Sequence, residues 1–192
     1  MDFNASVETG TPSKNAANNG IVLNGSTNFS FSNPSLGNAW TLSVWFKRTG
    51  NPTGQNAAIL TDEFNSGPSV VGAFIVNNYQ TGTNTSLTGG FFNQGYFTGP
   101  NVTFTTNEWH AFTVSWDGAF LRTYYDGTLS NATSYTATSV SSGSNFRIGR
   151  EWSYLTPDYV VGEIGQVLIY NRALFSNEVL QNYRATSNIF SV

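Results

Sequence analysis

Two segments of the chain alternate apolar and polar residues with the two-residue period of a β-strand. The first is WTLSVWFK at 40–47, and the second is HAFTVSW at 110–116. One face of the first would carry Trp40, Leu42, Val44 and Phe46, and the other would carry Thr41, Ser43, Trp45 and Lys47. Successive side chains of a strand point to opposite faces, so this pattern predicts antiparallel sheets with one buried face and one wetter face.

Asp-Gly pairs follow the second of these segments and the run after it. Asp117-Gly118 joins two apolar runs, and Asp126-Gly127 closes the next run. Asp-Gly favours tight hairpin turns because both residues tolerate a positive φ. The sequence therefore predicts a meander of antiparallel strands from Trp109 to about Asn131.

Short runs of β-branched and aromatic residues recur along the chain between clusters of Gly, Asn, Ser and Pro, which is typical of an all-β sandwich or barrel. We expect strands at 20–24, 28–32, 40–48, 57–62, 70–77, 88–97, 101–105, 109–117, 119–126, 144–149 and 159–170. One helix is expected at 176–184, with Ser176 available as its cap. This divides the chain into an N-terminal arm at 1–19, a sandwich at 20–185 and a C-terminal tail at 186–192.

The composition of the chain argues against several classes of function. The 192 residues suit one domain with a full core. Charged residues make up 10% and the net charge is -3, which argues against nucleic acid as a partner because phosphates need clustered Lys and Arg. The absence of cysteine and the single His exclude Cys-ligated zinc and a multi-histidine metal site. No run approaches the roughly 20 apolar residues of a membrane helix, and Met1–Glu8 lacks the pattern of a secretory signal.

Three segments resemble the laminin-G-like branch of the concanavalin A-like lectin/glucanase superfamily. They lie at 40–47, at 107–118 followed by 124–127, and at 162–174, where GEIGQVLIYNRAL leads into the expected helix. The resemblance implies a jelly-roll sandwich of two antiparallel sheets, with ligands on the concave sheet or the rim loops, often beside calcium. The family frequently has two acids where this chain has Gly165 and Gln166. Calcium prefers carboxylate ligands, so we expect no metal or other cofactor, with calcium as the alternative.

Two C-terminal runs are also similar to laminin-G-like domains in structural proteins of tailed bacteriophages. These are GQVLIYNRAL at 165–174 and LQNYRAT at 180–186. The resemblance implies a virion component, either a capsid decoration or a tail or fibre protein, assembled in the host cytoplasm. Its partners would be other virion proteins or further copies of itself, as in a trimer, together with cell-surface glycans. A stand-alone carbohydrate-binding module is the alternative, and no membrane partner is expected.

An enzyme is the third hypothesis, because the superfamily includes glucanases. Those enzymes carry closely spaced acids on one strand, and no Glu-x-Asp-x-x-Glu run exists here. Asp62 and Glu63 are adjacent, so on a strand they would point to opposite faces. His110 shares the apolar face of Phe112, Val114 and Trp116, which favours a buried, hydrogen-bonded histidine over a general base. We therefore expect no catalytic residues.

Aromatic residues beside polar ones give the best sign of a ligand site. Sugars stack on rings, while Arg, Asp and Asn bind their hydroxyl groups. The expected rim loop at 150–159 contains two such rings between two charged residues, and further candidates lie on two strands. The candidate ligand-binding residues are Arg150, Trp152, Tyr154, Asp158, Trp45, Asn78 and Tyr79. The alternative is that these rings pack under long loops or against a neighbouring subunit.

Overall fold

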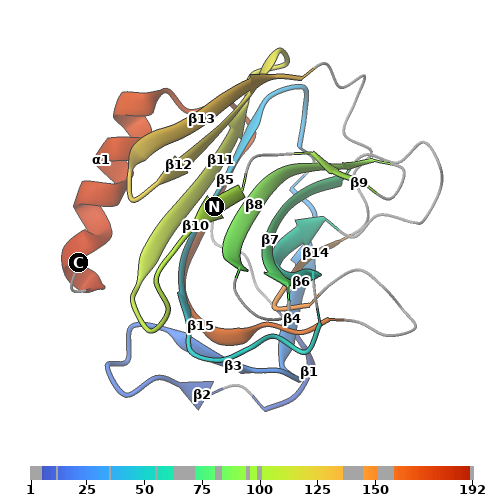
Figure 1. Cartoon of the computed structure of the whole chain (residues 1–192), viewed down its shortest axis with the longest axis vertical. Coiled ribbons are helices and arrows are strands. Elements are labelled where there is room, and N and C mark those ends of the chain that lie inside the picture. Colours follow the sequence, from blue (N-terminus) through green and yellow to red (C-terminus); the bar gives the residue numbers. More distant parts are fainter. Residues whose placement is uncertain are drawn as a thin grey trace.

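Two antiparallel sheets pack face to face, and one helix lies along the outer side of the second sheet (Figure 1). The computed structural model describes residues 6–11, 13–34, 36–54, 56–62, 72–80, 84–93, 96–98, 101–135, 145–150 and 158–190. This architecture confirms the all-β, two-sheet sandwich with one short C-terminal helix. No helix in these ranges is long and apolar enough to span a membrane.

The first sheet has the order β1-β4-β14-β6-β7-β8-β10, and β9 pairs with β8. Its strands are β1 (Ser6–Thr9), β4 (Asn28–Ser32), β6 (Asn56–Asp62), β7 (Gly72–Gln80), β8 (Asn84–Asn93), β9 (Tyr96–Thr98), β10 (Asn101–Thr103) and β14 (Asn145–Ile148). Part of the expected arm thus belongs to the sheet, because β1 pairs with β4.

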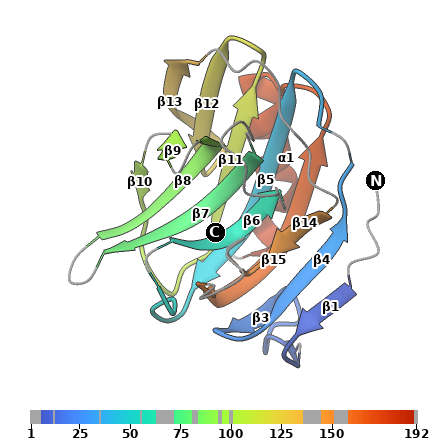
Figure 2. The same ribbon diagram turned by 90° about the vertical axis from the view of Figure 1, so that its right-hand side faces the viewer.

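The second sheet has the order β13-β12-β11-β5-β15-β3-β2. Its strands are β2 (Ser13–Lys14), β3 (Ile21–Asn24), β5 (Trp40–Arg48), β11 (His110–Trp116), β12 (Phe120–Tyr125), β13 (Thr128–Ser134) and β15 (Val161–Tyr170). Figure 2 shows β5, β11 and β15 side by side in this sheet.

The core between the sheets contains the apolar face that the alternation predicts. Trp40, Leu42, Val44 and Phe46 are all at most 1% exposed and belong to one cluster of buried side chains. Their strand partners on β11 are Trp116, Val114, Phe112 and His110 in the same order. Two strands of matching period therefore supply one continuous apolar surface.

The predicted meander is confirmed by the pairing of β11 with β12 and of β12 with β13. Asp126 and Gly127 have φ values of 47° and 75°, so this two-residue turn has positive φ at both positions. Gly118 also has a positive φ, of 96°. The Asp117 carboxylate accepts hydrogen bonds from the backbone N–H groups of Ala119 and Phe120, at 2.9 and 2.7 Å, which fixes the first turn.

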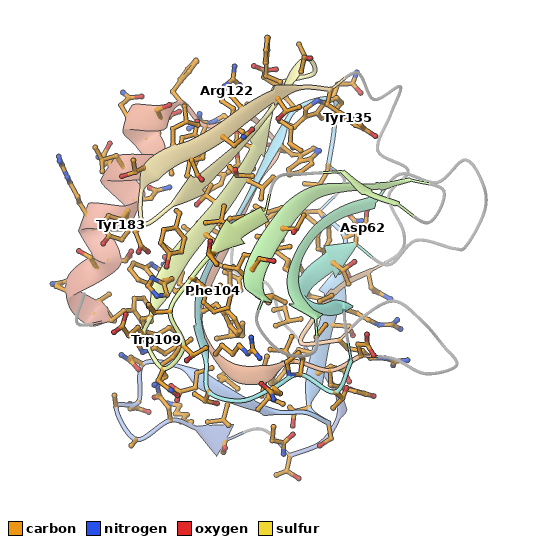
Figure 3. The ribbon with its side chains drawn as sticks, in the orientation of Figure 1. Asp62, Phe104, Trp109, Arg122, Tyr135 and Tyr183 are labelled. Carbon is orange, nitrogen blue, oxygen red and sulfur yellow. The ribbon has the colours of Figure 1, made fainter. Side chains whose placement is uncertain are left out.

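The second face of β5 and β11 is not wet, so that part of the prediction is wrong. All seven residues of β11 are buried. The cause is the C-terminal segment, in which α1 (Ser176–Thr186) and a 3-10 turn, η1 (Ser187–Ile189), cover this face of the sheet. Figure 3 shows Tyr183 on α1 and Trp109 beside the end of that segment.

The start of α1 also differs from the expected one. Phe175, not Ser176, occupies the cap position, and its side chain makes no capping hydrogen bond. The Glu178 carboxylate instead accepts a hydrogen bond from the Phe175 N–H at 2.8 Å. Ser176 is the first helical residue, and its hydroxyl lies 3.2 Å from the Tyr124 hydroxyl.

Candidate functional site

One end of the sandwich is formed by residues 48–54, 149–150 and 158–160, which we call the rim site. Arg48 ends β5 and is only 3% exposed. Its Nε donates a hydrogen bond to the Gly50 carbonyl at 2.8 Å, and its Nη2 donates to Asn51 Oδ1 at 2.7 Å. A buried guanidinium therefore fixes the loop that leads from β5 to β6.

The chain leaves β14 at Gly149 and returns at Val160, and these two residues hold the base of the 150–159 loop. The Val160 N–H donates to the Gly149 carbonyl at 3.0 Å, and the Gly149 N–H donates to the Ile59 carbonyl at 3.1 Å. Gly149 has a φ of 89°, and an added Cβ would lie 3.0 Å from the Thr27 carbonyl oxygen. Both the backbone conformation and the close approach require glycine here.

Arg150 and Tyr159 lie opposite each other just above this base, as an isolated antiparallel bridge. The Arg150 guanidinium carbon is 5.9 Å from the centre of the Tyr159 ring, which is a cation–π distance. Thr53 fixes Tyr159 from the neighbouring loop: its N–H donates to the Tyr159 carbonyl at 3.0 Å, and the Tyr159 N–H donates to Thr53 Oγ1 at 2.7 Å.

Asp158 lies against Gly54, where an added Cβ would collide with its carboxyl group. Arg150, Asp158 and Tyr159 are each half-buried, so they rest on the frame and still reach solvent. The rim site thus combines hydrogen-bond donors, an acidic acceptor and an aromatic ring within a few residues. Of the predicted loop residues, Trp152 and Tyr154 lie outside the described ranges.

Asn78 and Tyr79 lie near the end of β7, at the same end of the first sheet as the rim site. Asn78 pairs with Asn56, the first residue of β6, and Tyr79 pairs with Thr85. The loop at 48–54 leads directly into β6, so the register places Asn78 close to it along the sheet edge. The strand continues to Gln80, beyond its expected end at position 77.

Trp45 is not part of this site, which corrects the expectation of an exposed ring. It is 3% exposed and lies under the C-terminal segment. Its ring stacks on Tyr183 and Phe190, with centroid distances of 5.5 and 4.6 Å. Its Nε1 donates a hydrogen bond to Thr186 Oγ1 at 2.9 Å. The alternation placed Trp45 correctly on the second face, but that face is covered.

His110 has the structural role that its position in the pattern predicts. It is 7% exposed, and its Nδ1 lies 2.9 Å from Asp126 Oδ2. Its Nε2 lies 2.8 Å from the hydroxyl of Thr105, which also donates to Glu108. Asp126 in turn accepts the Ala111 N–H at 2.8 Å. The imidazole therefore links the turn after β12 to the segment before β11.

The pKa of the neighbouring Tyr125 phenol is raised, mainly by burial and then by the Asp126 charge.

Six carboxylates elsewhere in the described part of the chain are bound by structural partners. The pairs are Asp62 with Asn33, Glu108 with Thr105, Asp117 with Arg122, Asp126 with His110, Glu163 with Lys47 and Glu178 with Arg172. Asp62 is fully buried and so cannot reach a substrate. Within the described residues, no group of three or more His, Asp or Glu side chains could hold a metal ion.

The sequence of residues 23–180 matches the laminin-G type 3 family model, described as the concanavalin A-like lectin/glucanases superfamily. The chain belongs to this family. The match includes β3 to β15 and the first half of α1, and therefore also the rim site. A comparison with curated protein sequences found no match.

Solved structures share the fold of this laminin-G type 3 domain at low sequence identity. Domain 4 of AbnA, an extracellular GH43 arabinanase from Geobacillus stearothermophilus, has a TM-score of 0.66 and 17% identity over 92% of this chain and 86% of that one. Botulinum neurotoxin type C has a TM-score of 0.69 and 12% identity over 96% and 46%. A mutant Trypanosoma rangeli sialidase has a TM-score of 0.70 and 16% identity over 97% and 30%. The chain thus spans less than half of the toxin and sialidase chains.

Sequence reasoning named Arg150 and Asp158 as candidates, and the structure places both in the rim site, but it did not single out Tyr159 or Thr53. Tyr159 was detectable, because it is an aromatic residue adjacent to Asp158 where the loop rejoins the sheet. Thr53 gave no signal, since it lies 106 residues away in sequence from its partner and only the folded chain brings the two loops together.

Proposed function

We propose that this protein is a non-enzymatic binding domain that holds a glycan at the rim site. The observation that carries the proposal is the placement of Arg150, Asp158 and Tyr159 on a frame fixed by Thr53. A tyrosine ring offers a surface for the apolar face of a sugar, and the guanidinium and carboxylate offer a donor and an acceptor for its hydroxyl groups.

The structural neighbours support a glycan as the ligand class. The arabinanase domain is in complex with arabinotriose, and the type C neurotoxin interacts with two ganglioside molecules. The same fold therefore occurs in proteins that contact oligosaccharides. A shared fold does not imply a shared ligand, so the proposal depends on the side chains of the rim site.

A glycan array probed with the full chain, with and without calcium, tests the proposal. We expect binding that does not require calcium and that Arg150→Gln and Tyr159→Ala each weaken. Arg122→Gln is a matched control, because Arg122 lies 5.3 Å over the Phe120 ring in a different hairpin. An array without hits, or hits that both rim variants retain in full, would contradict a glycan site here.

A non-enzymatic role is supported by the structural bonds of the carboxylates. Glycosidases need two carboxyl groups about 5–9 Å apart across a cleft. Asp117, Asp126 and Glu178 each accept backbone hydrogen bonds that hold a turn or a helix start. We expect no hydrolysis of the glycans that bind, measured by the release of reducing ends. Turnover that survives removal of any contaminating enzyme would contradict this part.

We propose a virion as the setting of this binding, either as capsid decoration or as a tail or fibre protein. The support is the sequence resemblance to bacteriophage structural proteins at 165–174 and 180–186. An antibody against the chain would then label purified particles, and cross-linking would join the chain to a particle protein or to copies of itself. A protein recovered only outside the particles would contradict the virion setting and leave glycan binding standing.

A further inference from the structure

Strand β15 has a strand neighbour on both sides only in its first part. Val161–Ile164 pair with β3, whereas pairing with β5 extends on the other side to Tyr170 (Figure 2). Beyond Ile164, no described strand lies on the β3 side. In an antiparallel ladder, alternate residues direct their N–H and C=O groups to opposite sides. The stretch 165–170 therefore presents backbone donors and acceptors along an open edge.

A recess of about 250 Å³ lies along this edge. Its lining residues are Pro34, Val167, Leu168, Ile169, Tyr170 and Asn171. Pro34 has no N–H group, so it cannot donate to the neighbouring strand and complete the ladder. None of the described residues that line it is charged, which favours an uncharged occupant.

The edge lacks the usual protection against pairing with another chain. Natural sheets protect open edges with charged residues or proline on the edge strand. The stretch QVLIY at 166–170 has neither, and it combines high β-propensity with zero charge. Strand β13, at the opposite edge of the same sheet, has the mostly polar sequence TLSNATS, and all seven of its residues are exposed. The β15 edge is thus the apolar one.

The size of the recess distinguishes a peptide from a second copy of the domain. A stable interface between two folded chains uses about 20–30 residues on each side, whereas six of the described residues line this recess. A single extended peptide needs less, because main-chain hydrogen bonds supply its affinity and small pockets accept alternate side chains. We infer that the β15 edge binds an extended, uncharged peptide segment of a partner protein, which adds as a strand beyond β15.

This site lies at the other end of the sandwich from the rim site. β15 begins at Val161, directly after the rim-site residues 158–160, and ends at Tyr170 beside the recess. A partner attached at the β15 edge would leave the rim site free to face outward. The inference is independent of the proposed glycan, since it uses different residues.

Amide hydrogen exchange and NMR on the full ¹⁵N-labelled chain test the inference. The probe is a blocked seven-residue peptide of alternating threonine and valine. We expect changes in the amide chemical shifts at Val167–Asn171. The amides of β15 that point away from β5 should exchange at least about tenfold more slowly, because the peptide hydrogen-bonds to them. The same peptide with N-methyl groups on alternate residues is the matched control, and it should bind at least about tenfold more weakly.

Two variants at Pro34 complete the test. Pro34→Glu adds a charge to the recess and should abolish peptide binding, whereas Pro34→Ala should retain it, and both should keep the wild-type unfolding midpoint. Absence of edge shifts with this peptide and with a library of uncharged seven-residue peptides would overturn the inference. So would sedimentation of the free protein as a dimer that Pro34→Glu dissociates, because the occupant would then be a second copy.

Discussion

Gly165 lies directly beneath the aromatic ring of Phe190. An added Cβ at position 165 would collide with the tip of that ring and would lie 3.2 Å from the Trp45 Cβ. Phe190 also packs against Trp45 and Trp109, with centroid distances of 4.6 and 4.9 Å. The absence of a side chain at Gly165, in the irregular stretch of β15 between Ile164 and Val167, thus makes room for the C-terminal ring. An acidic side chain at position 165 is incompatible with this packing.

Gly165→Ala should displace the Phe190 ring and destabilise the protein. Overpacking of a filled site costs about 1–3 kcal/mol in the free energy of unfolding. Because Phe190 covers Trp45, we also expect acrylamide to quench the tryptophan fluorescence more strongly. Urea unfolding and quenching titrations measure the two effects.

Gly37→Ala is the matched control for this substitution, since nothing lies within 4 Å of an added Cβ there. It should leave both the stability and the quenching at wild-type values. If Gly165→Ala has the stability and quenching of Gly37→Ala, the Phe190 ring does not pack against position 165.

Glu178 should make the anchoring of α1 dependent on pH. The Arg172 guanidinium, and then the Phe175 N–H, lower the pKa of Glu178 from 4.5 to about 2. Because the folded-state pKa is the lower one, its contribution to stability is present above about pH 4.5 and is lost as the pH falls towards 2. The difference in Tm between the wild type and Glu178→Gln should therefore shrink over this range.

Thermal unfolding from about pH 6 to pH 2.5 measures that difference. Other acids, such as Asp117 with its lowered pKa, titrate equally in both proteins, so the comparison isolates Glu178. A constant gap in Tm across the range would show that its charge does not stabilise the helix start.

The strand pattern of the core was predictable because each of its residues obeys a local rule. Trp40, Leu42, Val44 and Phe46 alternate with polar residues, and all of them are buried between the sheets. The Asp126-Gly127 turn likewise follows from two residues that accept positive φ. Neither feature needs information from distant parts of the chain.

The covered second face and the frame of the rim site were not predictable in the same way. Trp45 lies on a face that local pattern marks as wetter, and only the return of α1 buries it. Arg150 and Asp158 were candidates by residue type, but another loop supplies the frame: Gly54 lies against Asp158, and Thr53 binds the adjacent Tyr159. Such contacts depend on tertiary packing between loops, which leaves no periodic signal in the sequence.

Asp126→Ala should destabilise the protein through two effects. The carboxylate accepts the Ala111 N–H and binds His110, and loss of such partly buried bonds costs about 1–3 kcal/mol. The φ of 47° at this position adds about 1–2 kcal/mol of backbone strain for alanine. Asp126→Gly loses only the bonds, and Asp126→Asn keeps a side-chain acceptor. We expect stability to fall in the order Asn, Gly, Ala, measured by urea unfolding, and equal stability of the three variants would refute the assigned bonds.

Gly54→Ala should weaken glycan binding at the rim site while leaving the fold intact. The added Cβ would collide with the Asp158 carboxyl group, so the carboxylate must leave its position against residue 54. Loss of one hydrogen bond to a charged group, about 1.5–3 kcal/mol, corresponds to about tenfold or more in Kd. Calorimetric titration with an array-selected glycan measures this, and Gly37→Ala again serves as the control.

Because Gly54 lies in a loop outside the core clusters, the Tm should change little. A Gly54→Ala protein with wild-type Kd would show that Asp158 does not contact the ligand. Tyr159→Ala tests separately whether the tyrosine ring does.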